Sequence, residues 1–213
     1  HKGTYEYTTH FTGLAGHGSA PDKGVNTIEY AARYINKLLE IREELKKRTP
    51  KNSIFDPPYT TLQIGGINGG IARNVIADKC HVDWELRPVV KDDGVWVNSE
   101  IDKFSSEVLL PNMKKIHKDS TIKKEIIGEI IGFDRDAESE ACELISRLTC
   151  DNSRAVVSFG TESCLFKEIG ISTVVCGPGS IEQAHKVDEY IKLDELKKCI
   201  NLLDGIRIKS IVN

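Results

Sequence analysis

A strict alternation of side chains over residues 4–12 constrains the fold more than any other stretch. One face of TYEYTTHFT would carry Tyr5, Tyr7, Thr9 and Phe11. Successive side chains of a strand point to opposite faces, so this period of two predicts a strand with one buried face. The alternation returns in VIADKCHVDWELR, residues 75–87. Its inward face would carry Cys80, Val82, Trp84 and Leu86.

The intervening segments predict two helices and two further strands. A long helix is expected over residues 24–48. Its apolar stripe would hold Ile28, Ala31, Ala32, Ile35, Leu38, Leu39 and Leu45. We also expect a second strand over 59–67 and a turn region at Gly65–Gly66 and Gly69–Gly70. A weaker helix over 94–111 and a strand over 120–131 follow. The order β-α-β-β-α-β is the ferredoxin-like pattern: four antiparallel strands with two helices on one face. We therefore expect an α+β domain over residues 1–118, with a returning strand to about 131.

Residues 132–213 show a different pattern of apolar residues. Helices are expected over 138–149, up to Glu168, and over 192–208, with short apolar strands at 155–157 and 173–176. Apolar strands that alternate with helices predict a mixed or parallel α/β sheet. Two strands are too few for such a sheet. We therefore expect a C-terminal portion of a larger α/β domain whose N-terminal half is absent.

Composition excludes several classes of function. The net charge is −3 with no strongly basic stretch, which argues against nucleic acid as a partner. The longest apolar runs are too short to span a bilayer, which argues against a membrane protein. Six cysteines are scattered without a Cys-x-x-Cys pair, so we expect a reducing, cytoplasmic setting.

Two glycine-rich motifs carry candidate polar residues. His17 stands among glycines in GLAGHGSAP, where it is either a surface-loop residue or a hydrogen-bond donor to a developing oxyanion. Asn74 stands in GGIARNVIAD, where it either serves the turn or binds a substrate carbonyl or carboxylate with its amide.

Two further motifs suit anionic groups. Arg87 ends the strand in WELRP; it is either charge-paired in solvent or a clamp for a carboxylate, because its fork matches two oxygens. Gly160 and Thr161 in FGTESCLF precede an expected helix, where unpaired N–H groups attract anions; a simple helix cap is the alternative.

One histidine is a candidate metal ligand. His185 follows a Gly-Pro-Gly-Ser turn in GPGSIEQAHKVDEY. The pairs His81–Asp83 and His117–Asp119 imitate a His-x-Asp metal pair, but their charged neighbours favour exposed surface. A catalytic zinc needs about three protein ligands, so His185 alone does not make a site.

Three segments together resemble the zinc aminoacylase/carboxypeptidase family. They are GHGSAPDKGVNTIEYAA, INGGIARNVIADKCHVDWELRP and FGTESCLFKEIGISTVVCGPGSIEQAHKVDEY, and the resemblance covers nearly the whole chain. It implies a lid, or dimerisation, domain followed by the C-terminal part of a catalytic domain. It further implies a cytosolic homodimer associated through the lid. The resemblance also implies a two-zinc site whose bridging water attacks the amide of a small-molecule N-acyl amino acid.

The resemblance also assigns roles to the candidate residues. His185 matches a zinc ligand, and His17 matches a lid histidine that steadies the oxyanion in the neighbouring subunit's site. Asn74, Arg87, Gly160 and Thr161 match substrate contacts. The family's other zinc ligands precede the lid, so we expect a hydrolase parent and an inactive chain by itself. The alternatives are a related hydrolase for a different N-acyl amino acid or dipeptide, and a non-catalytic dimerisation protein.

Overall fold

The computed structural model describes all residues except 133–138, 154, 158, 159, 185 and 213, and describes no side chains at 211 and 212. The chain divides into two compact units. The first comprises His1–Asp134 and Val156–Thr161, and the second comprises Arg135–Ala155 and Glu162–Asn213.

A four-stranded antiparallel sheet forms one layer of the first unit. Its strands are β1 (Thr4–Thr12), β3 (Thr61–Gly69), β5 (Lys79–Arg87) and β6 (Thr121–Ile130). The spatial order is β3-β5-β1-β6, so the first strand in the chain lies between the third and the fourth. This is the predicted ferredoxin-like arrangement, and the four-stranded α+β prediction is confirmed.

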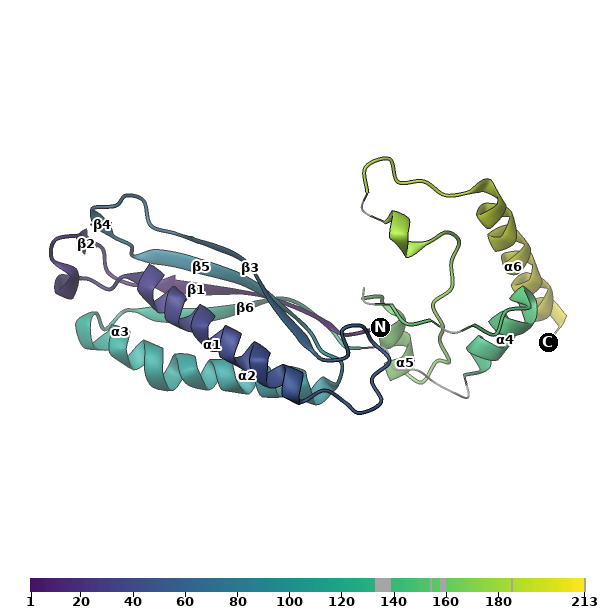
Figure 1. Cartoon of the computed structure of the whole chain (residues 1–213), viewed down its shortest axis with the longest axis horizontal. Helices are drawn as coiled ribbons and strands as arrows, with labels where there is room; N and C mark the ends of the chain where they lie inside the picture. Colours follow the sequence, from purple (N-terminus) through teal and green to yellow (C-terminus); the bar gives the residue numbers. More distant parts are fainter. Residues whose placement is uncertain (133–138, 154, 158–159, 185, 213) are drawn as a thin grey trace. The chain divides into compact units, whose positions relative to one another are not determined.

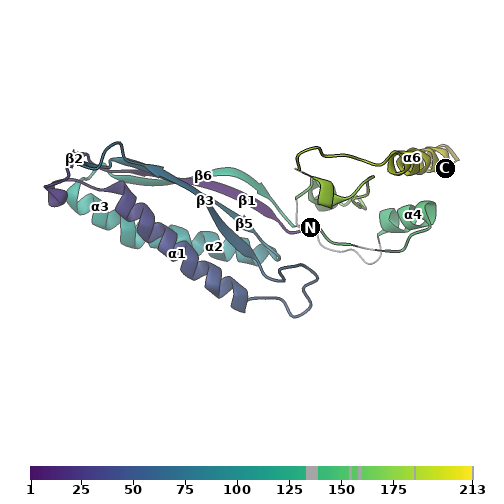
Figure 2. The same cartoon turned by 45° about the horizontal axis from the view of Figure 1, so that its top comes forward.

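Helices form the second layer, on one face of the sheet (Figures 1 and 2). They are α1 (Thr27–Lys47), α2 (Lys91–Phe104) and α3 (Leu110–Ile116). A five-residue π-helical segment, η2 (Ser105–Leu109), joins the last two. The helical region between β5 and β6 is therefore longer than the predicted 94–111.

The inward strand faces build the core as the alternation predicted. Tyr7 and Trp84 face each other across β1 and β5 and stack with ring centroids 4.4 Å apart. The Trp84 Nε1–H donates to Thr9 Oγ1 at 3.1 Å, and Thr9 Oγ1 lies 2.9 Å from the Tyr34 hydroxyl. The buried polar groups of these side chains are thereby paired, as burial requires.

The start and the stripe of α1 differ from prediction. The helix begins at Thr27 rather than 24, because the Asn26 side chain caps it by accepting from the Ile28 N–H at 3.2 Å. The buried stripe is Thr27, Tyr30, Ala31, Tyr34, Leu38, Ile41 and Leu45. Ile28, placed in the stripe by the sequence, is 39% exposed. Tyr30 and Tyr34 are buried together with the aliphatic residues. The buried face of α1 is therefore rotated by part of a helical turn relative to the predicted stripe.

A two-stranded ribbon lies at the end of the sheet far from the N-terminus (Figure 1). It pairs β2 (Gly16–His17) with β4 (Val75–Ile76). The single strand predicted over 75–87 is therefore two strands, β4 and β5. The predicted turn at Gly65–Gly66 is also wrong: the register shifts there within β3, which makes it a bulge. The chain turns instead at Gly70, whose φ of +75° suits glycine.

The second unit is helical in its described residues. Its elements are α4 (Glu140–Thr149), α5 (Ser163–Glu168), η3 (Ile181–Gln183) and α6 (Leu193–Val212). The strands predicted at 155–157 and 173–176 do not form, and no strand is found among the described residues after Ile130. A strand needs the hydrogen bonds of a neighbouring strand, and these apolar segments have none; Val156 is 38% and Val175 47% exposed.

Of the helices in the described part of the chain, none is long and apolar enough to cross a membrane.

Candidate functional site

The ribbon of β2 and β4 brings His17 and Asn74 together. His17 pairs with Val75, and the Gly18 N–H donates to the Asn74 carbonyl oxygen at 2.8 Å. A side chain at position 18 would be crowded, because an added Cβ would lie 3.2 Å from Asn74 main-chain atoms. Both polar side chains are exposed. We call His17, Ser19 and Asn74 the tip cluster.

The hydrogen bonds of His17 define its neutral tautomer. The Ser19 N–H donates to His17 Nδ1 at 3.2 Å, and Ser19 Oγ lies 2.7 Å from the same nitrogen. A main-chain N–H can only donate, so Nδ1 is the acceptor and the proton of the neutral ring is on Nε2. The exposed nitrogen of the ring is therefore the donor that an oxyanion would need.

Arg87 lies in a second cluster, at the opposite end of β5. Its Nη2 donates to Glu85 Oε2 at 2.8 Å and its Nε donates to the same oxygen at 3.2 Å, so one carboxylate already occupies part of the guanidinium fork. Its Nη1 donates to Thr4 Oγ1 at 2.8 Å. The two side chains of the ion pair are only 27% and 34% exposed, so the guanidinium is held in one orientation.

Gly160 and Thr161 lie in the same cluster as Arg87. An added Cβ at Gly160 would stand 2.6 Å from Thr4 Oγ1, so only glycine allows this approach. The Thr161 N–H donates to His1 Nε2 at 3.2 Å. That N–H is therefore occupied, whereas the sequence motif suggested an unpaired donor. We call His1, Thr4, Glu85, Arg87, Gly160 and Thr161 the strand-end cluster.

The two clusters are far apart within one chain. The ribbon adjoins the Lys79 end of β5, whereas Arg87 is its other end. At about 3.3 Å per residue the length of β5 alone separates them by about 26 Å. A small substrate cannot contact both clusters of one chain.

The predicted metal ligand lies outside the described residues, since position 185 is among those not described. Among the residues that the structure describes, no group of three or more His, Cys, Asp or Glu side chains could hold a metal ion. The pair His81–Asp83 is 3.9 Å apart at its nearest N and O atoms and lies on the exposed sheet face. The described residues therefore do not fit a catalytic zinc by themselves, which needs about three protein ligands.

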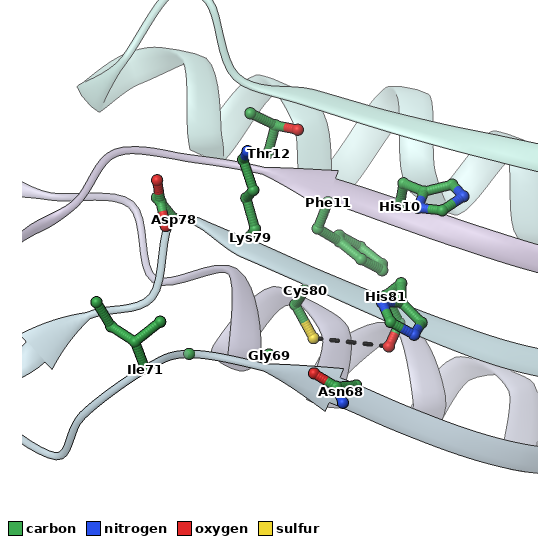
Figure 3. A pocket seen from close by; sticks show the side chains of 11 residues that line it. His10, Phe11, Thr12, Asn68, Gly69, Ile71, Asp78, Lys79, Cys80 and His81 are labelled. Atoms are coloured by element: carbon green, nitrogen blue, oxygen red, sulfur yellow. Dashed lines mark hydrogen bonds between the residues drawn. The ribbon is translucent and has the colours of Figure 1, made fainter.

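A shallow cavity of about 330 Å³ opens near the tip end of the sheet (Figure 3). Polar side chains from three strands line it, among them His10, Asn68 and His81. None of the predicted site residues contributes to its wall. Burial raises the pKa of the Cys80 thiol in this wall, so that thiol is a poor nucleophile. The cavity and the predicted site are thus different places.

Sequence reasoning missed four members of the clusters: His1, Thr4, Ser19 and Glu85. Ser19 and Glu85 each stand two residues from a predicted site residue, and that spacing was the available signal. His1-Lys2-Gly3 resembles the family's entry into the lid, but that resemblance assigns His1 no role, and its partner is 160 positions away.

Comparison with known proteins agrees with this fold. The model of the family described as "Peptidase dimerisation domain", M20 type, matches residues 1–113, which is more than half of the chain. Acetylornithine deacetylase of Pectobacterium carotovorum subsp. carotovorum (strain PC1) is 33% identical over 206 residues, 97% of this chain and 52% of the relative. Acetylornithine deacetylase of Proteus mirabilis (strain HI4320) is 34% identical over 194 residues, 91% of this chain and 48% of the relative.

Solved structures share the architecture. Aminopeptidase PepT of Bacillus cereus ATCC 10987 superposes with a TM-score of 0.64 at 21% identity, covering 96% of this chain and 51% of that chain. This chain spans about half the length of the curated relatives it matches. The matched model, the antiparallel sheet and its layer of helices together show that the chain belongs to the family of the M20 peptidase dimerisation domain.

Proposed function

We propose that this chain is part of a zinc-dependent amidohydrolase that converts N-acetyl-L-ornithine to ornithine and acetate in arginine biosynthesis. The names of the relatives support the substrate, and family membership supports a hydrolase parent. The enzyme acts in the cytoplasm as a homodimer joined through the first unit, whose boundary we place near residue 118 with a returning strand to about 131. Residues 132–213 are then the C-terminal part of the catalytic domain.

The observation that carries this proposal is the separation of the two clusters. Each suits one part of an N-acyl amino acid, yet about 26 Å lie between them in one chain. A two-fold dimer solves the problem, because each chain then presents its tip cluster to the other chain's strand-end cluster. His17 and Asn74 thus serve the partner's site, while Arg87, Gly160 and Thr161 serve their own.

The residues of this chain then act as donors and clamps. The His17 Nε2–H donates to the oxyanion that forms when the acetyl carbonyl is attacked, and Ser19 keeps that proton on Nε2. The Asn74 amide binds the same end of the substrate. The Arg87 guanidinium binds the amino-acid carboxylate through the part of its fork that Glu85 leaves open. His185 is the zinc ligand that this chain contributes; the remaining ligands are not among its described residues.

A mixing experiment tests the dimeric site. In the complete enzyme, His17→Ala and Arg87→Ala subunits are purified separately, mixed, and allowed to exchange. In a heterodimer one site receives both wild-type residues and the other receives both substitutions. Random exchange makes half of the dimers mixed, so turnover should recover to about a quarter of the wild-type value. No recovery in demonstrated heterodimers would contradict the shared site.

Substrate and metal are tested directly. The complete enzyme is assayed with N-acetyl-L-ornithine, N-succinyl-diaminopimelate and a dipeptide in parallel, and the first should give the highest kcat/KM. The best rate on another substrate would instead favour the related-hydrolase alternative. The 213-residue chain alone should show neither turnover nor stoichiometric zinc. Two zinc ions per chain with turnover would show that the chain is a sufficient catalyst.

A further inference from the structure

The imidazole of His1 is buried and has no part in the proposed mechanism. The residue is only 5% exposed. Its Nδ1 lies 2.7 Å from the Lys2 carbonyl oxygen, and its Nε2 lies 3.2 Å from the Thr161 main-chain nitrogen. A buried titratable ring with a partner at each nitrogen is fixed in orientation as well as in position.

These two hydrogen bonds favour one neutral tautomer of the ring. A carbonyl oxygen only accepts, so Nδ1 must carry a proton and donate it. A main-chain N–H only donates, so Nε2 must keep its lone pair and accept. The neutral ring with its proton on Nδ1 satisfies both bonds. A protonated ring would set two N–H groups against each other at Thr161.

The bond from Thr161 lies beside the predicted carboxylate clamp. Gly160, the preceding residue, stands against Thr4 Oγ1, which itself accepts from Arg87 Nη1. The Gly3 N–H donates to the Pro88 carbonyl oxygen at 2.8 Å, which fixes the segment that carries His1 to the end of β5. His1 is thus anchored on the Arg87 side and reaches across to the Gly160–Thr161 segment.

We propose that His1 is a positioning residue: by accepting from the Thr161 main-chain N–H, it holds Gly160 and Thr161 against the Arg87 clamp. It does not touch substrate and acts only through the main chain that it holds. The role rests on the proposed function of Arg87, Gly160 and Thr161. When the acceptor at Nε2 is lost, the segment moves away from the clamp and the substrate carboxylate is bound less well.

Kinetics of the complete enzyme give the first test. His1→Leu removes the acceptor, and KM should rise about tenfold, the usual effect of one lost hydrogen bond. Because His1 takes no part in the chemical step, kcat should stay within about twofold. His1→Gln places a carbonyl oxygen near the position of Nε2 and should restore most of the lost KM. The matched control is His117→Leu, at the C-terminal end of α3, which should leave KM unchanged.

Equal KM values for wild type and His1→Leu would overturn the proposal. So would a Gln variant no better than the Leu variant, because the acceptor would then not be the property that matters. A fall in kcat with unchanged KM would also contradict a positioning role.

Two measurements on the 213-residue chain are independent of activity. Nitrogen-15 NMR of the His1 ring should show the Nδ1–H tautomer near neutral pH; a protonated ring or an Nε2–H tautomer would overturn the assignment. Hydrogen exchange at the Thr161 amide should be slow in wild type and His1→Gln and faster in His1→Leu; unchanged exchange in a folded Leu variant would contradict the bond. If the Leu variant does not fold, the tautomer that NMR finds in the wild-type chain still tests whether His1 Nε2 is the acceptor. If the wild-type complete enzyme has no amidohydrolase activity, the proposed function is wrong. The NMR and hydrogen-exchange measurements would still test the hydrogen bond between His1 and Thr161.

Discussion

His17 and Ser19 stand two residues apart in a glycine-rich loop, and their bond sets which ring nitrogen faces solvent. In the complete enzyme, His17→Ala should lower kcat by about 10²–10³, the usual effect of losing one oxyanion donor. His10→Ala is the matched control, because His10 is an exposed histidine of β1 bonded to Glu125 and lies outside both clusters. Steady-state kinetics on both variants check this. Equal losses from the two substitutions would contradict a special role for His17.

The buried hydroxyl of Tyr34 links stability to pH. Burial raises its pKa above the ordinary value of 10.0, although the hydrogen bond with Thr9 opposes the shift. The folded state then keeps a proton that the unfolded state releases above pH 10, so this contribution is complete below pH 10 and is lost as pH rises further. The free energy of unfolding of wild type should fall more steeply above pH 10 than that of Tyr34→Phe, by about 1.4 kcal/mol per pH unit. Urea unfolding from pH 8 to 11 measures both slopes, and parallel slopes would contradict the linkage.

Asp93 joins three elements of the first unit. It lies in the first turn of α2 with 2% exposure and accepts from Arg48 Nε, beyond the end of α1, at 2.9 Å. It also accepts from the Thr60 hydroxyl just before β3. The Arg48 guanidinium lies over the Trp96 ring at 4.5 Å from its centroid, so the cation is held on two sides.

Asp93→Ala should therefore destabilise the first unit by about 2 kcal/mol, because it leaves a buried hydroxyl and a half-exposed guanidinium without their acceptor. Glu43→Ala is the control: it breaks an exposed pair with Lys46 on α1 and should leave the free energy of unfolding nearly unchanged. Urea unfolding monitored by tryptophan fluorescence measures both. A difference of less than about 0.5 kcal/mol between the two variants would show that the network adds nothing.

Local periodicity was enough to predict the sheet of the first unit but not its details. The period of two in β1 and β5 placed the buried faces correctly, because a side chain's face in a strand depends only on its position. The start of α1 was misplaced because the Asn26 cap was not recognised. The strands expected at 155–157 and 173–176 failed because pairing is non-local: apolar residues favour a strand, but only a neighbouring strand makes one.

The sequence was enough to identify several residues of the candidate site, but not to predict which of them lie close together. His17 and Asn74 were recognised separately, and their contact depends on the pairing of β2 with β4 across 57 residues. Arg87 and Gly160 likewise share Thr4 as a neighbour, although each of the three stands more than 70 residues from the other two along the chain. The role of His1 was missed, since its partner is a distant main-chain amide that the local sequence does not indicate.

At the scale of the whole molecule, the proposed site needs a second copy of the chain to bring the two clusters together, and the sheet offers an edge for it. β6 is an outer strand whose adjacent Ile126 and Ile127 are 58% and 57% exposed. The register between β6 and β1 shifts at this point, because Ile126 pairs with Tyr7 and Gly128 pairs with Glu6, so the two isoleucines form a β-bulge with exposed apolar side chains. An outer strand with exposed apolar side chains is prone to pair with another chain unless it is protected. We therefore expect the homodimer to form along β6, where antiparallel pairing would bring the tip of each sheet toward the other chain's strand end.

Ile127→Lys should accordingly shift the complete enzyme from dimer to monomer. It places a charge in the expected interface, and like charges related by the two-fold axis repel each other. Ile67→Lys is the matched control, because Ile67 is 50% exposed on β3, the opposite edge of the same sheet. Sedimentation velocity of both variants measures the change, and activity gives a second readout. If each site needs both chains, the monomeric variant should lose turnover while its circular dichroism remains that of wild type. A monomeric variant with full turnover would exclude the shared site, and a monomer produced by Ile67→Lys alone would move the interface to β3.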